Sequence, residues 1–240
     1  MHILDDILVV DMTQALAGPY CTMLLGDMGA EVVKIEQPGT GDQSRGWGPP
    51  FVEGESTYFL SVNRNKKSLT LNLKSDQGQE IIHCLVSRAD VFFTNLPRQS
   101  SRRKTGVDAE TLLDLNPSLI YAAITGYGDT GPYAERPGYD LIAQGESGLM
   151  SITGQPGGEP MRYPIPLSDM TTGLYAALGV LGALLARQQT GRGQVLDLSL
   201  LESQSAWLAI LASAYLNAGE APQRLGTIHP NIAPYQVFQA

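Results

Sequence analysis

The chain has 240 residues, of which 43% are hydrophobic and 17% charged, and its formal net charge is −8. This apolar content supports a sizeable core and excludes an intrinsically disordered chain. The acidic balance argues against nucleic acid as a main partner, because nucleic-acid-binding surfaces are strongly basic.

Strand and helix patterns alternate along most of the chain. Apolar, β-branched runs predict strands at residues 7–12, 31–35, 68–73, 90–93, 119–124 and 194–200. Helical spacing with Gly and Pro at the ends predicts helices at residues 18–28, 75–89, 109–116, 171–188 and 202–216. This alternation predicts an α/β fold with a mostly parallel sheet and helices on both faces. Ligands of such sheets bind outside the carboxyl ends of the strands.

The sequence is expected to contain one large domain and only the beginning of a second. We expect residues 1–220 to form one large domain, and residues 221–240 to begin a linker or strand that leads to a second domain. Residues 235–240 have the pattern of a strand interior, whereas a chain end is usually polar and frayed. The sequence is therefore expected to be a fragment truncated at its C-terminal end.

Cysteines, histidines and apolar runs indicate the compartment. Cys21 and Cys84 lack CxxC spacing and are predicted to be buried thiols in a reducing compartment. The three histidines lie far apart, so no metal site is expected. The first residues lack a signal-peptide pattern, and the longest apolar run, residues 174–186, is too short to span a membrane. We expect a cytoplasmic protein without a membrane partner.

Several common motifs are missing from the sequence. No GxGxxG follows the first predicted strand, and neither a P-loop nor a GxSxG elbow occurs. A dinucleotide-binding site, a nucleotide-phosphate loop and a serine hydrolase are therefore disfavoured. The lack of a familiar nucleophile–base pair favours a carboxylate that works without one.

Asp169 is the outstanding candidate for such a carboxylate. It follows the Pro-punctuated run YPIPLS at residues 163–168 and immediately precedes the strongest predicted helix. A carboxylate at this junction either caps the helix or points into a cleft as a nucleophile. The residues alone support the two roles equally.

Several short motifs occur in the same order as in a known family. Through them the chain resembles the family III CoA-transferases, a group that includes formyl-CoA transferase, carnitine CoA-transferase and α-methylacyl-CoA racemase. The motifs are LAGP (16–19), GAEVVKIE (29–36), NRNKKS (63–68), GYD (138–140), SGLM (147–150), LSD (167–169) and TGRGQ (190–194). The resemblance covers essentially the whole chain. Residues 55–58 and 63–68 together are most similar to the succinyl-CoA-dependent dicarboxylate CoA-transferases.

The resemblance implies a Rossmann-like, CoA-binding large domain and an activity. CoA would pass from an acyl-CoA to a carboxylic acid through an aspartyl anhydride and an aspartyl-CoA thioester, with Asp169 as nucleophile. The helix N-terminus is expected to lower the pKa of Asp169, while Ser168 or Thr171 caps the helix. Acyl-CoA is the expected substrate, no metal is expected, and the whole protein is expected to form an interlocked homodimer.

The resemblance also implies a set of binding residues. CoA would be held by Leu16, Ala17, Gln37, Leu71, Asn72, Lys74, Asn95, Leu96, Arg103, Lys104, Arg136 and Tyr139. For each basic residue, simple surface solvation remains the alternative. Trp47 and Tyr58 would border the acyl pocket.

Two positions depart from the family pattern. Gln37 stands where some members carry an arginine, so one phosphate contact is in doubt. Leu16 stands where formyl-CoA transferase has a glutamine, which disfavours a formyl and oxalyl substrate pair.

Two other functions stay open. Racemases and epimerases of the family place a histidine where this chain has Tyr139, and a tyrosine, with a pKa near ~10, is a poor base at neutral pH. Tyr139 therefore disfavours an acyl-CoA racemase or epimerase, which is kept as the first alternative. The second is a non-catalytic CoA-binding fragment.

Overall fold

A computed structural model describes residues 2–239 and shows a six-stranded sheet in the order β5-β2-β1-β6-β7-β8. Every strand pairing in this sheet is parallel. The strands are β1 (Leu8–Met12), β2 (Glu31–Glu36), β5 (Lys66–Thr70), β6 (Val91–Thr94), β7 (Ile120–Thr125) and β8 (Gln194–Ser199). The predicted α/β class is confirmed, and the strand order reverses between β1 and β6, as in a Rossmann fold.

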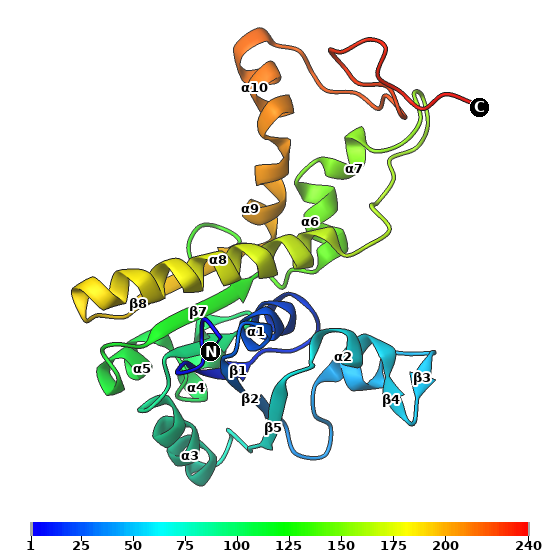
Figure 1. Ribbon diagram of the computed structural model, residues 1–240. Coiled ribbons are helices and arrows are strands. Elements are labelled where there is room, and N and C mark those ends of the chain that lie inside the picture. The colour runs from blue at the N-terminus through cyan, green and yellow to red at the C-terminus, as the bar shows by residue number, and fades with distance from the viewer. Residues whose placement is uncertain (1, 240) are drawn as a thin grey trace.

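Helices cover both faces of the sheet (Figure 1). One face carries α1 (Ala17–Asp27), α8 (Leu167–Thr190) and α9 (Leu200–Ser205). The other face carries α3 (Asp76–Val86), α4 (Gln99–Lys104) and α5 (Ala109–Leu115). The remaining elements are η1 (Gln43–Gly46), β3 (Phe51–Val52), β4 (Glu55–Ser56), α2 (Thr57–Val62), α6 (Asp140–Glu146), α7 (Leu149–Ile152), η2 (Ala206–Leu208) and α10 (Ala209–Ala218).

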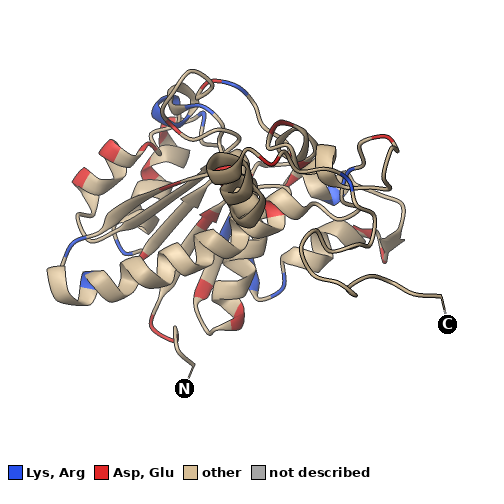
Figure 2. Cartoon of the chain, turned by 90° about the horizontal axis from the view of Figure 1, so that it is seen from above, with Lys and Arg blue, Asp and Glu red and all other residues tan. Residues whose placement is uncertain are grey.

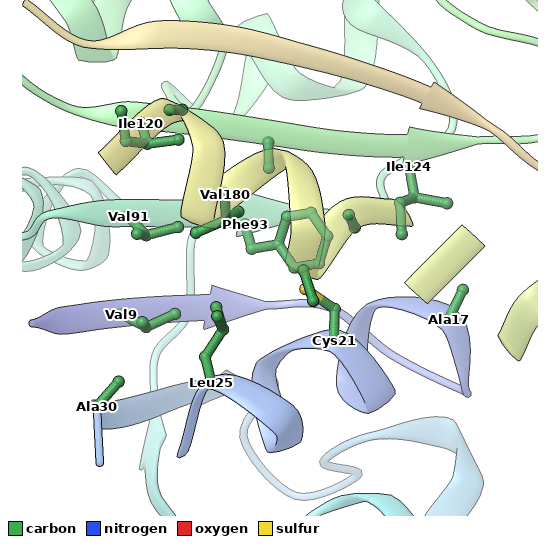
Figure 3. Packing of buried hydrophobic residues seen from close by; sticks show 14 of the residues in the cluster. Val9, Ala17, Cys21, Leu25, Ala30, Val91, Phe93, Ile120, Ile124 and Val180 are labelled. Atoms are coloured by element: carbon green, nitrogen blue, oxygen red, sulfur yellow. The ribbon is translucent and has the colours of Figure 1, made fainter. Parts of the chain in front are cut away.

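The central strands are buried on both faces, which explains their continuous apolar runs. Val9, Phe93 and Ile120 point toward the layer formed by α1 and α8 (Figure 3). Their neighbours Phe92 and Tyr121 point to the opposite face and stack with ring centroids 5.6 Å apart. Each strand therefore contributes to two hydrophobic clusters, and the sheet is held rigidly between them.

The long helix α8 places Asp169 at its first turn. Its 24 residues include only Asp169 and Arg187 as charged side chains, so the helix is almost entirely tan in Figure 2. By length and composition alone α8 could cross a membrane, which the predicted apolar run was too short to do. It packs on α1, β7, β8 and α9, as a core helix does.

Gly173 lies where α8 crosses α1, and we expect Gly173→Ala to destabilise the fold by about 1–3 kcal/mol. A Cβ at this position would lie 2.6 Å from the Ala17 carbonyl oxygen and 3.0 Å from Tyr20 Cδ1. A Cβ at Gly182 of the same helix would meet no described atom within 4 Å beyond the adjacent backbone of the helix itself. Gly182→Ala is therefore expected to stabilise by about 0.5–1 kcal/mol. Urea unfolding of both variants checks this, and equal effects would contradict the close crossing.

Several local predictions were wrong. The strand predicted at residues 68–73 runs from Lys66 to Thr70 instead, because these are the residues that pair with Val32–Glu36 of β2. The helix predicted at 202–216 is divided into α9 and α10 by the 3-10 turn η2. Cys84 is exposed on α3, whereas Cys21 is buried as predicted.

The predicted final strand is also absent from the described residues. Residues 235–239 form no strand, and Ala240 lies outside the described part of the chain. The Tyr235 ring instead packs edge-on against the His229 ring, with centroids 5.1 Å apart. The backbone carbonyl of Tyr235 accepts the backbone N–H of His229 at 2.9 Å. The division into residues 1–220 and 221–240 stays a prediction.

Candidate active site

A cavity of about 270 Å³ opens at the carboxyl ends of β1, β6 and β7. It lies at the point where the strand order reverses, which is where ligands of such sheets bind. The loop after β1, the loop after β6 and the start of α8 all reach its wall. Predicted site residues that line it are Leu16, Ala17, Trp47, Asn95, Leu96, Tyr139 and Asp169.

A second cavity, of about 210 Å³, adjoins the first. Gln14, Asn95 and Leu96 line both cavities. The Asn95 side chain accepts the Gln14 N–H at 3.0 Å and donates to the Gln14 carbonyl at 2.8 Å, so it ties the β1 and β6 loops together. Predicted residues Gln37, Leu71, Asn72 and Lys74 line this second cavity. Together the cavities form an elongated site with Asp169 at one end.

Asp169 does not cap its own helix. Among the described residues no hydrogen-bond donor contacts its carboxylate, which lines the first cavity. The free amides of α8 are capped by Asp140, whose Oδ1 accepts from Ser168 N at 2.8 Å and lies 3.4 Å from Asp169 N. The prediction that Ser168 or Thr171 provides the cap was wrong, since the Ser168 hydroxyl donates to Gln204 at 2.7 Å.

Burial sets the protonation of Asp169. It raises the pKa of this carboxyl to about 7, and the negative charge of Asp140 adds to the shift. The expected lowering by the helix N-terminus was wrong, because loss of solvent outweighs the helix dipole at this position. A carboxylate that ionises near neutral pH with few partners is a reactive group.

Trp47 lines the cavity with Asp169, whereas Tyr58 lines a neighbouring cavity together with Trp47, so their place at an acyl pocket stays a prediction. Their rings meet edge to face with centroids 4.9 Å apart. Burial, followed by the charge of Asp169, raises the pKa of Tyr58 to about 12. Tyr58 therefore stays protonated at neutral pH and can act as a hydrogen-bond donor, not as a base.

Three predicted phosphate ligands lie outside both cavities. Arg103 lines a different cavity on α4. Lys104 is exposed, and its carbonyl accepts from Gln79 at 3.4 Å. Arg136 stacks on the ring of Tyr133 at 4.0 Å. No cluster of three His, Cys, Asp or Glu side chains that could hold a metal ion occurs within residues 2–239.

The sequence analysis missed the ion pair that shapes the loop after β1. Lys34 and Asp42 are buried, 2.9 Å apart. Lys34 Nζ donates to the Thr13 carbonyl at 2.7 Å, and Asp42 Oδ1 accepts the Ala15 N–H at 3.1 Å. Ala15 is thereby held at a φ of 68°, a conformation that residues other than Gly rarely adopt. The available signal was a lysine between Val33 and Ile35 in a strand predicted to be buried.

Comparisons with known proteins agree with this geometry. The sequence model of CoA-transferase family III matches residues 4–240. The crystal structure of a CaiB/BaiF family protein from Brucella suis superposes with a TM-score of 0.93 at 45% identity, over 98% of this chain and 63% of that one.

Two curated relatives carry more specific names. A succinyl-CoA:glutarate CoA-transferase of Mus musculus is 48% identical over 100% of this chain and 55% of its own length. A succinate–glutarate CoA-transferase of Agrobacterium fabrum is 46% identical over 98% of this chain and 60% of its own length. The chain thus spans little more than half the length of these relatives. It belongs to CoA-transferase family III.

Proposed function

We propose that the protein containing this chain transfers CoA from an acyl-CoA, such as succinyl-CoA, to a dicarboxylic acid. The observation that carries the proposal is the Asp169 carboxylate, which lines the cavity and receives no hydrogen bond from the described residues. Family membership and the names of the relatives support the reaction and the class of acid.

In the first half of the proposed reaction, the Asp169 carboxylate attacks the thioester carbonyl of the donor. The carbon–sulfur bond breaks, which gives a mixed anhydride and CoA thiolate. The thiolate then attacks the Asp169 carbonyl and expels the donor as its carboxylate. Asp169 is left as an aspartyl-CoA thioester.

The second half runs the same steps with the acceptor. The acceptor carboxylate attacks the aspartyl thioester, releases CoA thiolate and forms a second anhydride. The thiolate attacks the acceptor carbonyl, which forms the new acyl-CoA and returns Asp169 to its carboxylate. No proton need be removed from carbon, so the reaction requires no base beside Asp169.

The two adjoining cavities support one orientation of bound CoA. We place the nucleotide in the second cavity, beside Leu71, Asn72 and Lys74, and the thioester in the first, beside Asp169. The Leu16 and Ala17 backbone at the start of α1 faces the thioester end, where the helix has no side-chain cap. Phosphate contacts from Arg103, Lys104 or Arg136 would require movement of these side chains toward the cavities.

The racemase or epimerase alternative lacks support at the cavity wall. No histidine occurs among the described residues that line the cavity with Asp169. Tyr139 lines it instead and is 69% exposed. A phenol is a poor partner for proton exchange at carbon near neutral pH.

The predicted homodimer fits the exposed apolar residues of α8, η2 and α10. Leu178, Trp207, Ile210 and Leu216 are between 55% and 81% exposed, and large exposed apolar side chains are typical of surfaces that bind a partner. A partner subunit, or further chain of the same protein, would cover them. The cytoplasmic location stays a prediction.

The test of the proposed function is capture of the covalent intermediate. We expect incubation with succinyl-CoA, followed by borohydride, to reduce the Asp169 thioester to an alcohol, which mass spectrometry locates in the peptide containing residue 169. Hydroxylamine should instead give a hydroxamate at the same residue. Asp169→Asn should give neither product. Modification at any other carboxylate, or none in an active enzyme, would disprove the mechanism.

A further inference from the structure

Asp140 joins two helices beside the proposed nucleophile. Its Oδ1 accepts the Ser168 N–H at 2.8 Å and thereby caps α8. Its Oδ2 accepts from Gln144 Nε2 at 2.7 Å, one turn along its own helix α6. Gln144 is fully buried, and its Oε1 accepts the Tyr163 N–H at 2.8 Å, from the segment that leads into α8. Asp140 is therefore held firmly against the start of α8.

We propose that Asp140 is a positioning residue for Asp169. Asp140 caps α8, so that Asp169 does not, and it places a fixed negative charge beside Asp169. The proposal rests on the proposed function, in which Asp169 must keep its oxygens free. An acidic residue in the first turn of a helix is otherwise drawn onto the free backbone amides. Because Asp140 already occupies the Ser168 amide, the Asp169 carboxylate faces the cavity.

The backbone path explains how Asp140 reaches this place. Gly126, which follows β7, and Gly138 lie in direct backbone contact, and a side chain at either position would clash with the other. This contact closes the loop between them and brings Tyr139 and Asp140 to the cavity wall beside Asp169.

Few other ionisable groups face Asp169. Tyr139 lines the same cavity. Tyr58 of α2 does not line it but lies close enough to feel the Asp169 charge, and its raised pKa keeps it protonated. Tyr20 of α1 packs further along α8, at Gly173. Among the described residues, β7 and α9 contribute only Ile124, Thr125 and Leu200 to the wall. The charge nearest to Asp169 is therefore that of Asp140, which agrees with its part in the raised pKa.

The test separates the cap from the charge. Asp140→Asn keeps an oxygen for the Ser168 amide and removes the charge, at the expense of the Gln144 contact. Asp140→Ala removes both. We expect Asp140→Asn to lower the pKa of Asp169 by about half a unit or more, read from the ¹³C carboxyl resonance that disappears in Asp169→Asn. The acid limb of kcat/KM for transfer should move by the same amount.

Thermal unfolding measures how much the Asp140 cap of α8 contributes to stability. Asp140→Ala is expected to lower Tm by about 2–4 °C, and Asp140→Asn by less. Asp114→Asn, an exposed change on α5, is the matched control and should move neither reading. An unshifted Asp169 resonance in Asp140→Asn, or an unchanged Tm in Asp140→Ala, would overturn the proposal. The resonance is measured without turnover, so a shift in a protein that transfers no CoA would refute the proposed function alone.

Discussion

Asp169→Asn is expected to lower the rate of CoA transfer by at least ~10³-fold, because the proposed mechanism needs the Asp169 carboxylate as the nucleophile. The amide is nearly the same size as the carboxyl, and the described residues donate no hydrogen bond that would be lost. Transfer from succinyl-CoA to glutarate measures the rate, and binding of CoA itself is the control for an intact site. Activity within tenfold of the unaltered protein would exclude Asp169 as nucleophile.

The same substitution should stabilise the protein above neutral pH. Burial raises the pKa of Asp169 from 3.8 to about 7, so the folded state binds its proton more tightly than the unfolded state. The free energy of unfolding therefore falls as pH rises from about 4 through about 7, by up to about 4 kcal/mol from this group. Asp169→Asn removes that loss. We expect its Tm to exceed that of the unaltered protein at pH 8 and to match it more closely at pH 4.

This expected trade between stability and activity has a physical origin. Moving a carboxylate out of water weakens the fold and strengthens the nucleophile at once. A substitution that is stabilising but inactive would therefore show that the site is strained for its chemistry. Equal stability at pH 8 would show that water reaches Asp169 more freely than its burial indicates.

The fold was predictable because its signals are local. Buried strands such as β6 and β7 are short apolar runs between helices of clear period, and parallel order follows from that alternation. Elements without such a pattern were missed. Helices α2 and α6 have only six and seven residues, too few to show a clear helical period in the sequence.

The site was predictable only in part, because its chemistry depends on contacts between distant residues. Asp169 could be singled out from its place before a helix. The cap from Asp140 crosses 28 residues of sequence, and the pKa of Asp169 depends on burial that no local pattern reports. The bond between Asn95 and Gln14 crosses 81 residues, so the join between the two cavities was equally hidden.

Asp42→Ala is expected to cost about 3–5 kcal/mol of folding free energy, the largest stability effect we predict. It leaves the buried Lys34 ammonium without its carboxylate partner, which lies 2.9 Å away, and also removes the acceptor for Ser44 N at 2.9 Å. Asp27→Ala is the control, since its ion pair with Arg64 is exposed and should contribute less than about 1 kcal/mol. Urea unfolding of both variants measures the difference.

We expect Asp42→Ala to weaken CoA binding as well, through the loop after β1. Without Asp42 the Ala15 amide loses its acceptor, so the loop can leave its left-handed conformation and withdraw Leu16 from the cavity wall. CoA should then bind more weakly even at temperatures where the variant is folded. Adding Lys34→Met to Asp42→Ala removes the unpaired charge and should recover most of the lost stability. It should not recover the binding, because the support for Ala15 is still missing. Recovery of both would show that the ion pair serves the core alone and does not shape the site.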